Sequence, residues 1–272
     1  MGSGIAEVCA RSGVDVTVVE ADDAGVARAE AAIARSLDRA VRAGKLEATE
    51  SEAATGRLAY TTALADLEGA DAAIEAVIED EDLKRDVFKV LDATLPDAQF
   101  LASNTSSVPI MKLGAETSQP GRVIGLHFFN PVPVLPLVEI VTSIMTTPAT
   151  VEKARSFAEE TLGKQCIDSQ DRAGFVVNAL LIPYLLSAIR MYESGFASKE
   201  DIDQGMIKGC AHPMGPLQLA DLIGLDTLLA VSASLYEEFR DTASVAPALL
   251  NRMVEAGLLG RKSGRGFYDY SS

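Results

Sequence analysis

The sequence predicts an α/β protein in two parts, a doubly wound and mostly parallel sheet followed by an all-helical domain. Three observations predict this. Short apolar runs typical of buried strands alternate with helical patterns up to about residue 170. One of these runs, Val14–Val19, ends in an acid, Glu20, as the second strand of a dinucleotide-binding unit does. After residues 171–174 only helical patterns follow. We therefore divide the chain into domains 1–170 and 171–272.

Length and composition exclude several classes of protein. The chain has 272 residues, 48% of them hydrophobic and 23% charged, which is typical of globular proteins with a substantial core. A formal net charge of −15 argues against a nucleic-acid partner, because phosphate binding needs clustered Lys and Arg. The three cysteines, Cys9, Cys166 and Cys210, are far apart and lack metal-ligand spacing. They predict reduced thiols in a cytoplasmic protein and no metal site.

The longest apolar stretch, Ala173–Tyr192, is about as long as a membrane span. Asn178, Pro183 and Arg190 interrupt it. A buried helix is therefore the better interpretation. No signal peptide is recognisable at the start of the sequence, so we expect no membrane partner.

The periodicity of apolar residues predicts the individual elements. Asp22 and Ser198 are expected to cap the helices that follow them, and Asp226 to cap a later one. Expected strands span residues 14–19, 58–61, 71–77, 99–102, 123–129, 137–141 and 164–168. Expected helices span residues 2–10, 22–42, 81–95, 148–162, 175–192, 198–208 and 217–223, with others after residues 49, 224 and 249.

The stretch from Gly125 to Glu139 organises the chain. It contains a strand, a stiff loop with three prolines and a second strand, so the loop can turn the chain back on itself. His127 and Glu139 would then face each other. A carboxylate that orients a histidine fixes its tautomer and stabilises the imidazolium, which suits acid–base chemistry. From spacing alone, a structural histidine beside a surface glutamate is an equally good interpretation.

Three motifs carry a resemblance to a known family. They are the string HFFNPVP from His127 followed by LVE ending at Glu139, the polar run at residues 103–107, and Pro-Met-Gly-Pro at residues 213–216. With them the chain resembles the L-3-hydroxyacyl-CoA dehydrogenases, most of all the bacterial 3-hydroxybutyryl-CoA dehydrogenases, almost from end to end. This likeness implies a Rossmann-like NAD-binding domain followed by a helical dimerisation domain.

The resemblance also implies roles for individual residues. His127 would be the acid–base group and Glu139 its orienting acid, with Ser106 and Asn178 bonded to the reacting part of the substrate. Independently, Glu20 should accept hydrogen bonds from the adenosine ribose and repel a 2′-phosphate, which favours NAD over NADP. The full set of expected cofactor-binding residues is Gly2, Glu20, Glu79, Lys84, Asn104 and Asn130. Four basic residues between 35 and 45 would lie near CoA or form a solvated helix face.

The sequence departs from the family at its start. By resemblance, Gly2 is the third glycine of the dinucleotide fingerprint, so we expect the first strand and the first two glycines to be absent. A start codon assigned too far downstream, a clipped chain, or a chain that binds cofactor poorly would each explain this. The first explanation is favoured because everything downstream looks intact.

The expected activity is NAD-dependent interconversion of a short L-3-hydroxyacyl-CoA and its 3-ketone in fatty acid or butanoate metabolism. The expected partners are an acyl-CoA substrate and a second copy of the chain, because the helical domain has more apolar surface than one small domain hides. Two alternatives stay open: a dehydrogenase of a 3-hydroxy acid without CoA, and a non-catalytic dimer without cofactor.

Overall fold

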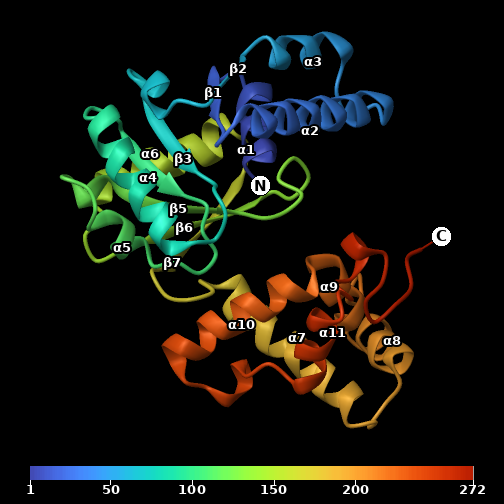
Figure 1. Ribbon diagram of the computed structural model, residues 1–272. Coiled ribbons are helices and arrows are strands. Elements are labelled where there is room, and N and C mark those ends of the chain that lie inside the picture. Colours follow the sequence, from blue (N-terminus) through green and yellow to red (C-terminus); the bar gives the residue numbers. More distant parts are fainter. Residues whose placement is uncertain (272) are drawn as a thin grey trace. The chain divides into compact units, whose positions relative to one another are not determined.

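The computed structural model describes residues 1–271, which divide into two compact units, residues 1–171 and residues 172 onward (Figure 1). This division lies one residue from the boundary that the sequence predicts. The first unit contains all seven strands of the described chain, and the second is helical.

The strands of the first unit form two sheets. β1 (Val16–Val19) and β2 (Leu58–Thr61) pair in parallel. The second sheet has the order β3-β4-β5-β6-β7 and is parallel except between β5 and β6. Its strands are β3 (Ala72–Glu75), β4 (Phe100–Ser103), β5 (Val123–Phe128), β6 (Leu137–Thr142) and β7 (Gln165–Gln170).

The helices of the first unit lie against these strands. α4 contacts β3 and β4, while α6 contacts β4, β5 and β6. α1 contacts β1 and packs with α2 and α3 (Figure 1). The helices are α1 (Gly2–Arg11), α2 (Asp23–Arg42), α3 (Ala48–Thr55), α4 (Glu81–Thr94), α5 (Ile110–Gly114) and α6 (Pro148–Ser156), with short turns at Leu64–Leu67, Pro120–Arg122 and Phe157–Thr161.

The core of the first unit explains why α1 lies where it does. Ile5, Val8 and Cys9 recur at helical spacing and are buried among side chains of β4, β5 and β6. Val132, in the loop after β5, belongs to the same cluster. The first helix and this loop are therefore held by one apolar core.

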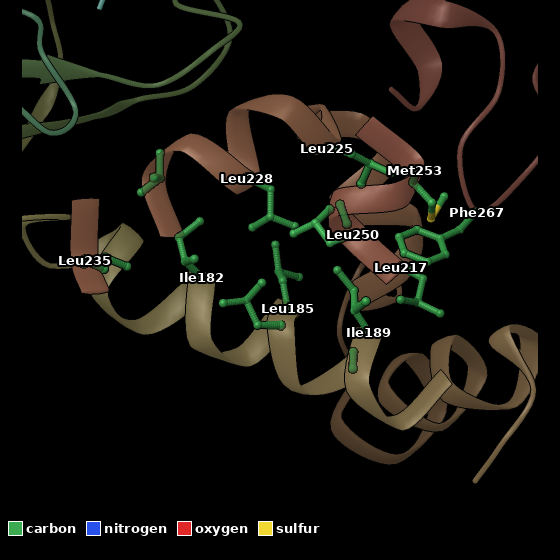
Figure 2. Close-up of a cluster of buried hydrophobic side chains, with 14 of the residues drawn as sticks. Ile182, Leu185, Ile189, Leu217, Leu225, Leu228, Leu235, Leu250, Met253 and Phe267 are labelled. Carbon is green, nitrogen blue, oxygen red and sulfur yellow. The ribbon is translucent and has the colours of Figure 1, made fainter. Parts of the chain in front are cut away.

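The second unit is built around α7 (Val177–Glu193). Leu185 and Ile189 are fully buried and face side chains from the later helices and from Phe267 in the tail (Figure 2). The other helices are α8 (Lys199–Cys210), α9 (Pro216–Ile223), α10 (Leu225–Phe239) and α11 (Ala248–Glu255), with short turns at Thr242–Ser244 and Arg261–Ser263. Among the described residues, no single helix is long and apolar enough to span a membrane, although α9 and α10, bent by 95° at their junction, pass that test as a pair.

The predicted caps are correct at two of three positions. Asp22 accepts a hydrogen bond from Gly25 N at 2.6 Å, and Ser198 caps α8. The prediction that Asp226 caps α10 is wrong, because Gly224 occupies the N-cap. Its φ of +103° is a conformation that glycine adopts without strain. Asp226 lies in the first turn instead.

Two other expectations about the fold need correction. The helix expected from residue 148 to 162 ends as an α-helix at Ser156, and a π turn follows, closed by a hydrogen bond from Leu162 N to Phe157 O. The sequence predicts one sheet, but the strands form two. Within residues 1–271 no strand pairs with both β1 and β3, so no strand joins the two sheets by hydrogen bonds.

Replacement of Leu185 by Ala should lower the free energy of unfolding by about 2–5 kcal/mol, because it removes a fully buried side chain and leaves a cavity. Urea unfolding followed by circular dichroism measures this. Met191→Ala on the same helix, where the side chain is 41% exposed, is the matched control and should cost less than about 1 kcal/mol. Equal losses in the two variants would contradict the packing described for α7.

Candidate functional site

His127 and Glu139 form a buried pair across two antiparallel strands. The register of β5 and β6 places the two residues directly opposite each other. His127 Nδ1 lies 2.6 Å from Glu139 Oε2, and both side chains are buried. A carboxylate partner at Nδ1 favours the tautomer with its hydrogen on that atom, so Nε2 is the nitrogen that can exchange a proton with a ligand. The arrangement is that of an oriented acid–base group.

The polar run after β4 is organised around the carboxylate of Glu79. Glu79 Oε1 accepts hydrogen bonds from Thr105 Oγ1 at 2.5 Å and from the backbone N–H groups of Ser106 and Ser107 at 2.9 Å. It also accepts one from Ser107 Oγ at 2.8 Å. A single acid therefore fixes the turn that carries Ser106.

The buried ammonium of Lys84 forms an ion pair with this carboxylate. Lys84 is 1% exposed, and its Nζ lies 2.8 Å from Glu75 Oε1 and 3.3 Å from Glu79 Oε2. Ser103 Oγ donates to the other oxygen of Glu75 at 2.6 Å. The ammonium of Lys84 is therefore enclosed by these two carboxylates. Its expected cofactor contact stays a prediction.

The ionisation of Glu79 reflects these contacts. Partial burial opposes the charged form, but the hydrogen bond from Thr105 and the positive charge of Lys84 outweigh it. The pKa of Glu79 is therefore lowered from its usual 4.5. The carboxylate stays ionised, and keeps accepting hydrogen bonds from the turn, at a pH where an ordinary glutamate would be partly protonated.

Asn104 links this turn to the strand that carries His127. Its Oδ1 accepts a hydrogen bond from Phe128 N at 2.8 Å, and its own N–H donates to Glu75 O at 2.8 Å. Asn104 thus fixes the spacing between β4 and the end of β5. Asn130, the other asparagine expected to bind cofactor, is exposed just beyond β5.

The first turn of α1 approaches the ends of two strands closely. A Cβ on Gly2 would lie 3.6 Å from Ala76 Cβ, just after β3, and a Cβ on Gly4 would lie 3.1 Å from Val132 Cβ, in the loop after β5. The N–H groups of a helix's first turn favour an anion such as a diphosphate. Small residues in this turn leave room for the backbone to approach its neighbours.

Glu20 borders a pocket at the end of β1. It follows β1 and lines this pocket, of about 570 Å³, together with Ser3 from α1 and Arg28 and Arg35 from α2. A Cβ added to Gly25 would lie 3.1 Å from both Cβ and Oε2 of Glu20, so the start of α2 packs closely against the acid. The first turn of α1 and an acidic strand end therefore border one pocket.

Asn178 lies in the second unit, in the first turn of α7, and is partly buried. Its approach to His127 stays a prediction. Within the first unit the structure brings together His127 and Glu139, and it places Ser106 and Asn104 on one turn. Sequence reasoning missed Glu75, although a lone acid at the end of the apolar strand β3 is an available signal.

Two family models match this chain. One, described as 3-hydroxyacyl-CoA dehydrogenase, NAD binding domain, covers residues 1–172, and the C-terminal domain of the same enzymes covers residues 174–270. The chain is 57% identical over 272 residues to a 3-hydroxybutyryl-CoA dehydrogenase of Mycobacterium tuberculosis, covering 99% of this chain and 95% of the relative. It is 42% identical to one from Clostridioides difficile, covering 100% and 96%.

The solved structures agree with these sequence comparisons. The crystal structure of (S)-3-hydroxybutyryl-CoA dehydrogenase from Ralstonia eutropha is similar to this chain with a TM-score of 0.93 and 45% identity, covering 100% of this chain and 96% of that one. The sequence and the fold therefore point to the same group of proteins.

The Glu79→Gln variant should be less stable than the wild type at pH 7, and the difference should shrink as the pH falls below 4.5. The pKa of Glu79 is lowered by folding, so its contribution is present above the unfolded-state value of 4.5 and is lost as the pH falls through the folded one. Urea unfolding across pH 7 to pH 3.5 measures this. Glu52→Gln, at an exposed acid on α3, is the control and should show no such convergence.

Proposed function

The chain belongs to the 3-hydroxyacyl-CoA dehydrogenase family, and we propose that it oxidises the 3-hydroxyl of a short L-3-hydroxyacyl-CoA to the ketone, or catalyses the reverse reduction. The proposed substrate is 3-hydroxybutyryl-CoA, which is the substrate named for its relatives in Mycobacterium tuberculosis and Clostridioides difficile. The observation that carries the proposal is the buried His127–Glu139 pair, with 2.6 Å between Nδ1 and Oε2.

The residues around the first turn of α1 fit NAD. A helix N-terminus built from small residues suits a diphosphate, and Glu20 at the border of the same pocket suits a ribose with a free 2′-hydroxyl. A negative charge at Glu20 disfavours the 2′-phosphate of NADP. Gly2, Glu79, Asn104 and Asn130 are proposed to complete the cofactor surface, together with Lys84 beside Glu79. When bound, NAD supplies the hydride acceptor at this site.

His127 is proposed to take the proton from the substrate's 3-hydroxyl at its Nε2. Glu139 holds the ring through Nδ1, so Nε2 keeps one orientation, and the carboxylate offsets the positive charge that develops on the imidazole. Because both side chains are buried, this charge interaction is stronger than it would be in water. In the reverse reaction the imidazolium returns the proton to the oxygen.

Ser106 and Asn178 are proposed to position the substrate. The hydroxyl of Ser106 lies on the turn fixed by Glu79 and would hydrogen-bond the reacting oxygen beside His127. Asn178, from α7, would bond the acyl carbonyl. Holding both oxygens limits the substrate to the orientation in which its 3-hydrogen faces the cofactor.

We also propose a homodimer formed through the helical unit. The helical unit exposes large apolar side chains that a second copy would cover; Leu180 and Phe196 are 73% and 79% exposed. A cytoplasmic location is proposed from the cysteines, since Cys9, Cys166 and Cys210 are all free thiols.

Replacement of His127 by Gln should lower kcat by about 100-fold or more, because glutamine can still hydrogen-bond but cannot carry a proton. Steady-state assays with 3-hydroxybutyryl-CoA and NAD measure this. His212→Gln is the matched control, at a histidine whose Nδ1 lies 3.3 Å from Tyr184 Oη in the second unit, and should stay near the wild-type rate. A His127 variant with near-normal kcat would remove the acid–base role.

The substrate class is tested by comparing thioester with free acid. NADH oxidation should be at least about 100-fold faster, as kcat/KM, with acetoacetyl-CoA than with acetoacetate, because binding energy from the CoA part contributes to catalysis. Equal values for the two would instead indicate a dehydrogenase of free 3-hydroxy acids. No NADH oxidation with either would reject the proposed enzyme activity.

A further inference from the structure

We propose that Lys164 is a positioning residue for this reaction, whose buried ammonium holds the turn at residues 131–136 between the strand of His127 and the strand of Glu139. The proposal rests on the proposed function, because it assigns Lys164 a part in the geometry of that site. Lys164 does not itself reach the reacting groups; it acts through the main chain of the turn.

Both side-chain hydrogen bonds of Lys164 are made to this turn. Lys164 follows the π turn and precedes β7, and it is 9% exposed. Its Nζ donates to Val132 O at 2.6 Å and to Leu135 O at 2.8 Å. The next residue, Gln165, donates its backbone N–H to Pro136 O at 2.8 Å. Three hydrogen bonds from two consecutive residues therefore fix both halves of the turn.

Within the turn itself, few main-chain hydrogen bonds keep its shape. Val134 N and Leu135 N both donate to Pro131 O at 3.0 Å, which closes one loose helical turn. The prolines at positions 131, 133 and 136 have no N–H to donate. The carbonyls of Val132 and Leu135 accept hydrogen bonds from the ammonium. They would lose these donors if Lys164 were replaced by an apolar residue.

The same turn touches the candidate cofactor surface. Val132 is buried, and the space for a Cβ on Gly4 in the first turn of α1 lies only 3.1 Å from Val132 Cβ. The turn is therefore held between α1 and Lys164. A shift of the turn would move Asn130 on one side and the start of the β5–β6 ladder, Phe128 opposite Val138, on the other.

The charge of Lys164 is costly to bury, which argues that its role is geometric. Among residues 1–271 no ion pair links its ammonium to a carboxylate. Burial, with the nearby charge of Arg11, lowers the pKa of Lys164 from its usual 10.5, while Cys9 acts weakly in the opposite direction. A lysine whose charged form is disfavoured by folding does not stabilise the fold through that charge.

The Lys164→Met variant tests the proposal, because methionine keeps most of the side-chain volume and removes the charge and the donors. We expect kcat with acetoacetyl-CoA and NADH to fall at least tenfold, while KM for the acyl-CoA stays within about twofold. Hydrogen exchange of the Val134 and Leu135 amides should become at least tenfold faster. Lys164→Arg, which keeps a charged donor, should restore kcat to within about threefold of the wild type.

Lys199→Met is the matched control. Lys199 Nζ also donates to a main-chain carbonyl, that of Phe267 at 2.8 Å, but it lies in the second unit. This variant should leave kcat and the exchange of the turn unchanged. If circular dichroism shows that Lys164→Met does not fold, Lys164→Gln replaces it, and we expect the same changes in kcat and in amide exchange with the same unchanged KM.

The outcomes separate this proposal from the proposed function. A kcat within twofold of the wild type, or unchanged exchange at Val134 and Leu135, overturns the role of Lys164 whatever the variant's melting temperature. A wild-type protein inactive on acyl-CoA substrates overturns the proposed function instead. In that case the exchange rates alone decide whether Lys164 holds the turn.

Discussion

The site depends on the antiparallel pairing of β5 with β6. Every other strand pair in the described chain is parallel. Because β5 and β6 are antiparallel and joined by a short turn, side chains only 12 residues apart in sequence lie directly opposite each other in the sheet. The register sets His127 against Glu139. A slip of one residue would turn Glu139 to the other face of the sheet and leave a buried histidine without its acid. The turn that joins the two strands is therefore as important to the chemistry as the strands themselves.

Two buried lysines hold the irregular segments around this pair. Lys84 supports Glu79, which in turn fixes the polar turn after β4, and Lys164 binds the carbonyls of the turn after β5. Both segments lie at the ends of strands, where the backbone has left the sheet and lacks regular partners. An ammonium offers three donors on a flexible stem and can satisfy such groups in whatever directions they point. In both places a charge that is costly to bury holds main-chain atoms at the end of a strand, for Lys84 by way of Glu79.

Much of the fold and part of the site could be predicted. The strand positions, the change to helices near residue 171 and the caps Asp22 and Ser198 all follow from local patterns, which act within a few residues. The facing of His127 and Glu139 was predictable because a proline-rich turn joins their strands. The role of Glu75 was missed because Lys84 and Ser103, which bind its carboxylate, lie 9 and 28 residues away in sequence. The role of Lys164 was missed because Leu135 and Val132, whose carbonyls it binds, lie 29 and 32 residues away.

The sequence by itself determined the family, the order of strands and helices and the types of residue available for acid–base chemistry. It could do so because these depend on short-range periodicity and on motifs of adjacent residues. Only the tertiary structure decided that Lys84 is enclosed by two carboxylates, that one oxygen of Glu79 holds a whole turn, and that Lys164 reaches back to Val132. The reason is that hydrogen bonds and buried charges act over a few ångströms in space, whatever the distance along the chain.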